Sequence, residues 1–70
     1  MDLSETQLQL LQIIDRNPPG YVTKTAEGTK DMMALAMKGL VTDVYETASG
    51  GLSGRLSLKG RDVIFQNSTK

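Results

Sequence analysis

The sequence predicts a single small α+β domain in which helices pack against a two-stranded β-hairpin. Three observations support this fold class. An amphipathic pattern over residues 3–16 ends abruptly at a Pro-Pro-Gly sequence. A second helical pattern ends at Gly39 and is followed at once by a run rich in β-branched residues. A glycine-rich loop then separates this run from a second strand-forming segment at residues 55–58.

The size and composition of the chain limit what kind of protein it is. Its 70 residues, 39% of them hydrophobic, suffice for one core. Cysteine and histidine are absent, which excludes disulfides, the usual zinc ligands and the commonest general base. No apolar run approaches the roughly 18 residues of a membrane span, and the N-terminus does not resemble a secretion signal. We therefore expect a cytoplasmic protein with no membrane partner and no cofactor.

Residues 3–16 are predicted to form the first helix. Ser4 and Gln7 have the spacing of a capping box, so Ser4 is the expected N-cap. The sequence of residues 17–20, Asn-Pro-Pro-Gly, ends the helix, and residues 21–23 favour a short extended segment that is a candidate third strand. The apolar residues that recur at helical spacing or widen the apolar side are Leu3, Leu8, Leu10, Leu11, Ile13 and Ile14.

The second predicted helix ends at Gly39. Thr29 is its expected N-cap, because Gly28 would cost about 1 kcal/mol inside a helix. Gly39 followed by Leu40 matches a glycine C-cap with a hydrophobic contact. The apolar side of the helix contains Met32, Leu35, Ala36 and Leu40, and an adjoining row contains Met33 and Met37.

The predicted hairpin consists of a strand at residues 40–47, a flexible loop at residues 49–54 and a return strand at residues 55–58. Regular alternation places Val41 and Tyr45 on the same face of the first strand. The residues of the return strand that we expect to face inward are Leu56 and Leu58.

A short final helix is predicted after the hairpin, over residues 59–65, with Ser57 as its N-cap. The apolar residues 63–65 of this helix are expected to fold back onto the core. We expect one domain over residues 1–66 and a frayed tail at residues 67–70.

Two segments of the chain carry a family resemblance. The segment Leu35-Ala-Met-Lys-Gly-Leu-Val-Thr resembles the end of the recognition helix and the first wing strand of bacterial winged-helix regulators, broadly the MarR-like and PadR-like groups. The segment Arg55-Leu-Ser-Leu-Lys-Gly-Arg-Asp-Val-Ile resembles their return strand and the capped helix after it. The family usually has threonine where Ser57 stands, and its glycine matches Gly60. With the first helix, the resemblance covers most of residues 3–65.

This resemblance implies a small DNA-binding regulator of transcription, prokaryotic or phage-derived, that acts as a homodimer. The chain departs from the family in one respect. The stretch between Pro19 and Gly39 is too short for a complete helix-turn-helix. The first helix of that motif is therefore expected to be missing or reduced to a turn over residues 24–28.

If the domain binds double-stranded DNA as the resemblance implies, the second helix enters the major groove and the wing contacts an adjacent groove or the backbone. The outer face of that helix would then contact DNA through Thr29, Lys30, Met33, Ala34, Met37 and Lys38. Backbone phosphates would be held by Thr23, Lys24 and Thr25, and Arg55 would be the wing residue. The alternative for each lysine is an ordinary solvated surface charge.

A protein-interaction module on the same scaffold is the competing hypothesis, for example a phage or mobile-element protein that binds a host factor. The zero net charge of the chain and the shortened motif favour it. Met33 and Met37 either fill the core, for which methionine is well suited, or form the seam of a homodimer or another protein interface.

Enzymatic activity is not expected. The glycines at positions 50, 51 and 54 lack the lysine and the flanking strand and helix of a phosphate-binding loop. The aspartates lie on separate predicted elements and form no pattern typical of a metal site or of paired acid–base carboxylates. The sequence therefore predicts a binding domain without catalytic residues or metal ligands.

Overall fold

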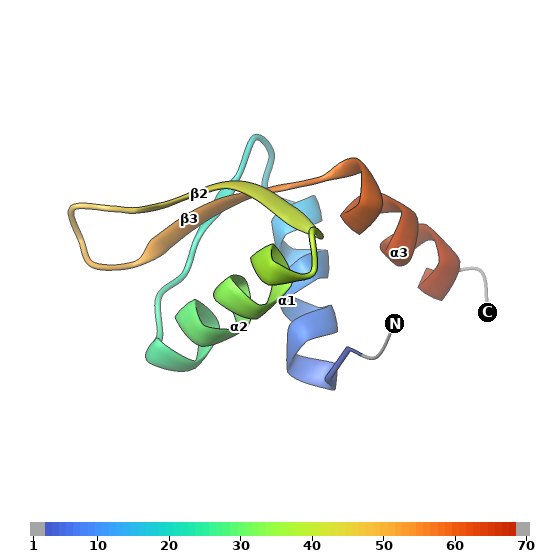
Figure 1. The fold of residues 1–70 in the computed structure, drawn as a ribbon, viewed down its shortest axis with the longest axis horizontal. Coiled ribbons are helices and arrows are strands. Elements are labelled where there is room, and N and C mark those ends of the chain that lie inside the picture. Colours follow the sequence, from blue (N-terminus) through green and yellow to red (C-terminus); the bar gives the residue numbers. More distant parts are fainter. Residues whose placement is uncertain (1–2, 69–70) are drawn as a thin grey trace.

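Three helices and a three-stranded antiparallel sheet make up residues 3–68, the part of the chain that the computed structural model describes. In chain order the elements are α1 (Glu5–Asp15), β1 (Tyr21–Val22), α2 (Ala26–Met37), β2 (Val41–Glu46), β3 (Leu52–Leu56) and α3 (Leu58–Ser68) (Figure 1). The strands lie in the order β1-β3-β2. The α+β class, the hairpin and the third short strand are confirmed, and the architecture is compatible with a small winged-helix-like domain.

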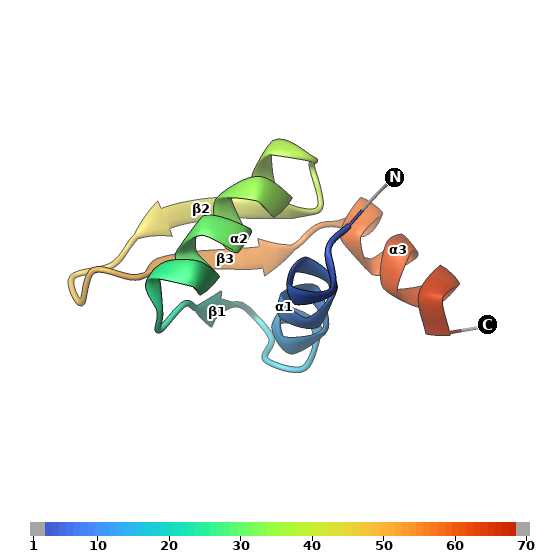
Figure 2. The same ribbon diagram turned by 90° about the horizontal axis from the view of Figure 1, so that it is seen from below.

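The helices lie on one side of the sheet. Helix α2 runs beneath β2 and β3, α1 lies beside α2, and α3 lies beyond α1 next to the end of β3 (Figure 1). The view from below shows α2 in front of the strands, with α1 between α2 and α3 (Figure 2). Within residues 3–68 no helix covers the opposite side of the sheet, which we call the open face.

The first helix begins as its sequence predicts. The Ser4 hydroxyl accepts a hydrogen bond from the Gln7 N–H (3.1 Å), and the Gln7 side-chain oxygen accepts one from the Ser4 N–H (3.2 Å). This reciprocal capping box satisfies two backbone donors that would otherwise have no partner in the first turn.

The second helix begins one turn earlier than expected, at Ala26. Its N-cap is Thr25, whose hydroxyl accepts a hydrogen bond from the Gly28 N–H (2.9 Å), so the prediction that Thr29 is the cap was wrong. Gly28 lies inside the helix, where a Cβ would come within 3.1 Å of the Thr25 hydroxyl. Residues 26–28 therefore belong to α2 itself, and no other helix lies between β1 and α2, where a complete helix-turn-helix motif would have its first helix.

The end of α2 matches the predicted glycine cap. Gly39 has a φ of 77°, its N–H donates to the Ala36 carbonyl (3.0 Å), and the Leu40 N–H donates to the Leu35 carbonyl (3.0 Å). This is the Schellman pattern, in which a left-handed glycine lets the chain leave the helix while the last carbonyls stay hydrogen-bonded. Leu40 is fully buried and leads the chain into β2.

Strand β2 contains an irregularity that the sequence pattern did not predict. Its register against β3 shifts between Thr42 and Tyr45, and Asp43 adopts a φ of 54°. Such a bulge turns the residues after it to the other side of the sheet. Val44 consequently packs against the core, whereas Tyr45 is 61% exposed. The prediction that Val41 and Tyr45 share a face was wrong, because it assumed uninterrupted alternation.

The return strand is also placed differently. Strand β3 spans Leu52–Leu56, so the connecting loop is shorter than the expected residues 49–54. Leu58 does not face inward from a strand; it is the first residue of α3 and is 85% exposed. Leu56, by contrast, packs against the core as expected.

The N-terminus of α3 is held against the end of α2. The Ser57 hydroxyl accepts a hydrogen bond from the Gly60 N–H (2.9 Å), as predicted for an N-cap, and donates one to the Gly39 carbonyl (2.7 Å). A Cβ on Gly60 would collide with the carbonyl oxygen of Leu40, so this position requires glycine. The short motif from Ser57 to Gly60 therefore joins the two ends of the hairpin.

The far end of α3 departs from expectation in two ways. Val63 and Ile64 pack against the core, but Phe65 is 63% exposed and does not fold onto it. Residues 67 and 68 belong to the helix, whereas residues 69 and 70 of the expected frayed tail lie outside the described part of the chain.

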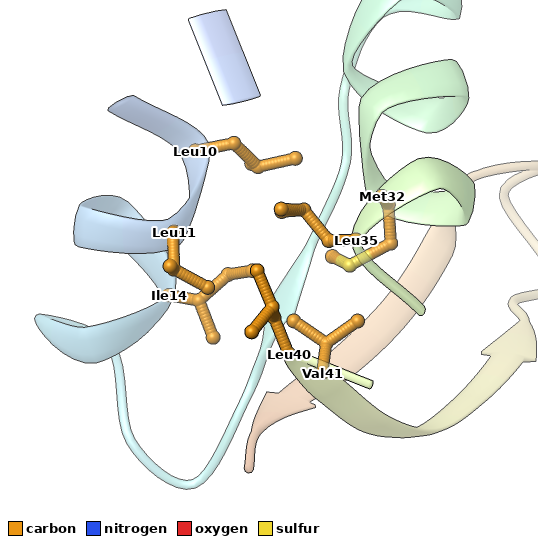
Figure 3. Close-up of a cluster of buried hydrophobic side chains, with 7 residues drawn as sticks. All are labelled: Leu10, Leu11, Ile14, Met32, Leu35, Leu40 and Val41. Atoms are coloured by element: carbon orange, nitrogen blue, oxygen red, sulfur yellow. The ribbon is translucent and has the colours of Figure 1, made fainter. Parts of the chain in front are cut away.

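The buried core joins α1, α2 and the start of β2. Its side chains converge between the two helices and the strand in Figure 3. The seven buried hydrophobic residues are Leu10, Leu11, Ile14, Met32, Leu35, Leu40 and Val41. Of the methionines of α2, Met32 belongs to this core, and Met33 and Met37 do not.

Candidate interaction surfaces

The outer side of α2 is partly apolar. Met32 and Leu35 point into the core, so the residues on the opposite side of the helix are exposed. Met33 is 55% exposed and Met37 is 88% exposed, and the exposed Lys30 lies on the same side at helical spacing. We call Lys30, Met33 and Met37 the α2 face.

The charges around the α2 face balance one another. Lys30 lines a shallow groove together with Glu27 and Asp31 on the same helix. Lys24, just before the helix, is exposed. Two lysines thus lie near two carboxylates, and this side of α2 lacks the positive surplus typical of DNA-binding surfaces.

The three threonines of the predicted DNA site have structural roles. Thr23 is buried, its hydroxyl shares a hydrogen bond with the Thr29 hydroxyl (2.8 Å), and it also accepts one from the Leu52 N–H (3.0 Å). Thr29 further donates to the Thr25 carbonyl (3.0 Å), and Thr25 caps α2. These hydroxyls connect the start of α2 to β3.

Two further residues of the predicted site lie toward the C-terminal half of α2. Ala34 is half-buried. Lys38 is also half-buried, and its ammonium group donates to the Gln7 side-chain oxygen (3.0 Å). Since Gln7 belongs to the capping box of α1, Lys38 ties the end of α2 to the start of α1.

Arg55 lies on the open face, on the other side of the sheet from the α2 face. A Cβ on Gly54 would meet the Met32 sulfur, so position 54 faces α2 and its neighbour Arg55 faces away. Arg55 pairs across the sheet with Thr42, near the start of β2 and far from the turn at residues 47–51. Arg55 is thus in the hairpin, but it does not adjoin the glycine loop as expected, because β3 already begins at Leu52.

The turn of the hairpin and the start of α2 do come together. They line a common groove, and the residues that line it are Val22, Thr23, Lys24, Thr25, Ala26, Thr29, Ser49, Gly50 and Gly51. Lys24 is the cation of this groove, and the turn at residues 47–51 contributes small and polar residues without charge.

The open face contains a surface that the sequence did not reveal. Tyr45 and Arg55 line one groove together with Pro19, Gly20 and Ser53. Arg55 also lines a neighbouring groove with Lys59 and Arg61 of α3. The signal present in the sequence was the concentration of basic residues after position 55, but assigning them to a surface required knowledge of which face of β3 is covered.

Comparisons of the chain with protein-family models, with curated proteins and with solved structures found no match. The winged-helix resemblance therefore rests on the two segments that begin at Leu35 and Arg55. Between residues 3 and 68 no helix has the length and apolar character needed to cross a membrane. In the same residues, no group of three or more acidic, histidine or cysteine side chains is placed to hold a metal ion.

Proposed function

We propose that this domain is a protein-interaction module that binds a second copy of itself through the α2 face. The observation that carries the proposal is the exposure of Met37 (88%) and Met33 (55%) on one side of a well-anchored helix. Full burial of a methionine side chain contributes roughly 1.5–3 kcal/mol, so a partner that covers both gains substantial apolar burial. Methionine also adapts its shape readily to an opposing surface.

The charges beside the methionines favour self-association over binding to a polyanion. Lys24 and Lys30 each line a groove with Glu27 and Asp31, and a two-fold related copy presents the same balanced set. The size of the domain also favours a dimer. A standard interface buries about 800 Å² per partner, roughly a sixth of the 4753 Å² surface of this domain, and small domains commonly gain stability in this way.

Sedimentation velocity on the full 70-residue chain tests this proposal. We expect a concentration-dependent dimer in the micromolar range, and the double variant Met33→Lys, Met37→Lys should be monomeric at the same concentrations. The matched control is Leu58→Lys, which places a charge at an equally exposed apolar position on α3 (85% exposed). A monomeric wild type, or a dimer that survives the double variant, would contradict the proposal; circular dichroism establishes that each variant is folded.

A second candidate function is DNA binding by a transcriptional regulator, with α2 as the recognition helix. It is favoured by the position of α2, which leads directly into the hairpin, and by the groove in which Lys24 lies beside the hairpin turn. Both functions use the same side of α2, so a dimer through the methionines would occupy the surface that enters a major groove.

Titration of duplex DNA over a range of salt concentrations separates the two functions. DNA binding through α2 predicts affinity that falls steeply with salt. The double variant Lys24→Ala, Lys30→Ala should then reduce the slope by about 0.9 for each phosphate that the protein no longer neutralises. Arg55→Ala is the comparison, since it removes a cation from the open face: a slope that falls in this variant and not in the lysine variant would place duplex binding away from α2. Absence of salt-dependent binding at micromolar protein would exclude this candidate.

A further inference from the structure

A track of one aromatic residue and three cations begins on the open face and continues onto α3. Arg55 is common to two adjoining grooves: the first is shared with Tyr45, and the second is shared with Lys59 and Arg61. We call these four residues the basic track. It runs from Tyr45, near the end of β2, past Arg55 on β3 to the first turn of α3.

The bulge in β2 gives Tyr45 its outward orientation. Tyr45 lies directly opposite Ser53 on β3, so both side chains are on the same side of the sheet as Arg55. Without the extra residue at Asp43, alternation from the buried Val41 would point Tyr45 toward α2. β-Bulges are often found beside functional sites, where they re-aim a side chain.

Among the residues that line the two grooves, the three cations of the track outnumber the carboxylates. One carboxylate, Asp43, lines the same groove and forms an ion pair with Arg55 (3.3 Å), in which both side chains are more than half exposed. Such an exposed pair is weak and exchanges readily for a phosphate. Lys59 and Arg61 lie in the first turn of α3, which contains no acidic residue, so the positive end of the helix dipole adds to their field.

We infer that the basic track binds a single-stranded nucleic acid, with a base stacked on Tyr45 and phosphates on Arg55, Lys59 and Arg61. An aromatic side chain on an open sheet face, followed by cations along a groove, is the combination that recognises unpaired bases and their backbone. A duplex hides the faces of its bases in the stack, so it engages the cations but not the ring. Ring stacking and phosphate binding do not involve the 2′-hydroxyl, so DNA and RNA strands of the same sequence should bind alike.

This surface is independent of the proposed dimer. The strand residues of the track, Tyr45 and Arg55, lie on the other side of the sheet from α2, since Gly54 faces Met32 while Arg55 faces away from it. A dimer formed through Met33 and Met37 would leave Tyr45 and Arg55 of both copies accessible. The two proposals can therefore fail separately.

Fluorescence anisotropy of a labelled mixed-sequence single strand, titrated with the full chain at several salt concentrations, tests the inference. Wild type should bind the single strand more tightly than its duplex. Replacing Arg55, Lys59 and Arg61 by alanine should reduce the salt slope by about 2, since each phosphate contact to a single strand contributes about 0.7. Tyr45→Ala should weaken binding about 5- to 150-fold, the range for loss of one stacked base, while Tyr45→Phe should retain it.

The control is the double variant Lys24→Ala, Lys30→Ala, which removes the cations near α2 and should leave binding to the single strand unchanged. Three results would overturn the inference: no binding of the single strand at low salt and micromolar protein, equal affinity for single strand and duplex with no effect of Tyr45→Ala, or equally effective competition by polyglutamate. The last result would identify the track as a surface for acidic protein segments. Circular dichroism of each variant separates loss of binding from loss of folding.

Discussion

The two sides of this domain present opposite kinds of surface. Beneath the sheet, α2 exposes two methionines among lysines and carboxylates that offset each other. The open face and the first turn of α3 present a tyrosine and three cations along two adjoining grooves, which one carboxylate also lines. The β-strand β3 contributes to both sides of the sheet, because its successive residues face alternately toward α2 and toward the open face. The zero net charge of the chain therefore conceals a strongly asymmetric arrangement.

This contrast shows why overall composition is a poor guide to the partner of a small domain. Electrostatic attraction depends on local surplus, and here the surplus is confined to the end of β3 and the first turn of α3. The apolar surplus is confined to one row of α2. The two surfaces consist of different exposed side chains, so substitutions of those side chains can remove one surface and leave the other intact.

The largest effect on the free energy of unfolding is expected at Met32, and the comparison is with Met37 of the α2 face. Met32 is fully buried beneath Gly54, whereas Met37 is 88% exposed. We expect Met32→Ala to lower the free energy of unfolding by about 2–5 kcal/mol, as for other large-to-small core substitutions. Met37→Ala should change it by less than about 0.5 kcal/mol. Urea unfolding at low protein concentration, where dimers are not populated, measures both.

Equal losses for the two variants would contradict this assignment of the core. Met32→Leu is the matched control, because it preserves most of the volume at the buried position and should cost less than about 1.5 kcal/mol.

A smaller loss of folding free energy is expected at Gly60, in the segment from Ser57 to Gly60 that joins β3 to α3. We call this segment the junction. Gly60 lies against the Leu40 carbonyl, a backbone atom that cannot move aside as a side chain can. Gly60→Ala should lower the free energy of unfolding by about 1–3 kcal/mol through overpacking and should also displace Lys59 and Arg61. Thermal unfolding monitored by circular dichroism measures the first effect, and single-strand binding measures the second.

The comparison for this prediction is Gly50→Ala in the hairpin turn. Gly50 has a φ of 93° but open space around it, so its cost comes from the backbone alone and should not change binding to the single strand. If Gly60→Ala and Gly50→Ala affected binding of the single-stranded nucleic acid equally, the contact at Gly60 would not be needed to position Lys59 and Arg61.

Local signals explain which parts of the fold could be predicted from the sequence. The capping box of Ser4 and Gln7 and the glycine cap at Gly39 depend on neighbouring residues, and both are found where the sequence placed them. The start of α2 was missed because Thr25 and Thr29 are both suitable N-caps by residue type. In the structure the Thr29 hydroxyl instead bonds to the Thr23 hydroxyl, which also accepts from the Leu52 N–H of β3, and such long-range contacts are not visible in the local sequence.

Surface assignments failed where they depended on strand register. Regular alternation cannot reveal a bulge, so the outward orientation of Tyr45 could not be predicted. The same limitation applied to Arg55, which the sequence placed beside the glycine loop and the structure places on the open face. The pattern of the sequence identified the basic residues correctly, but it could not identify which of them share a surface.

The smallest effect on stability is expected at the bulge itself, where the two properties of Asp43 can be separated. Asp43 provides the left-handed conformation that turns Tyr45 outward, and its carboxylate competes with phosphate for Arg55. Asparagine tolerates the same conformation without the charge, so Asp43→Asn should change the free energy of unfolding by less than about 1 kcal/mol. Because Asp43→Asn releases Arg55, we expect this variant to strengthen binding of the single-stranded nucleic acid severalfold at low salt.

The comparison is Asp43→Val. Valine is β-branched and disfavours a positive φ, so this variant should weaken binding by turning Tyr45 away. Anisotropy titrations of the two variants measure both effects. If Asp43→Asn left the affinity unchanged while Asp43→Val reduced it, the bulge would matter for the orientation of Tyr45 and the ion pair would have no part in binding.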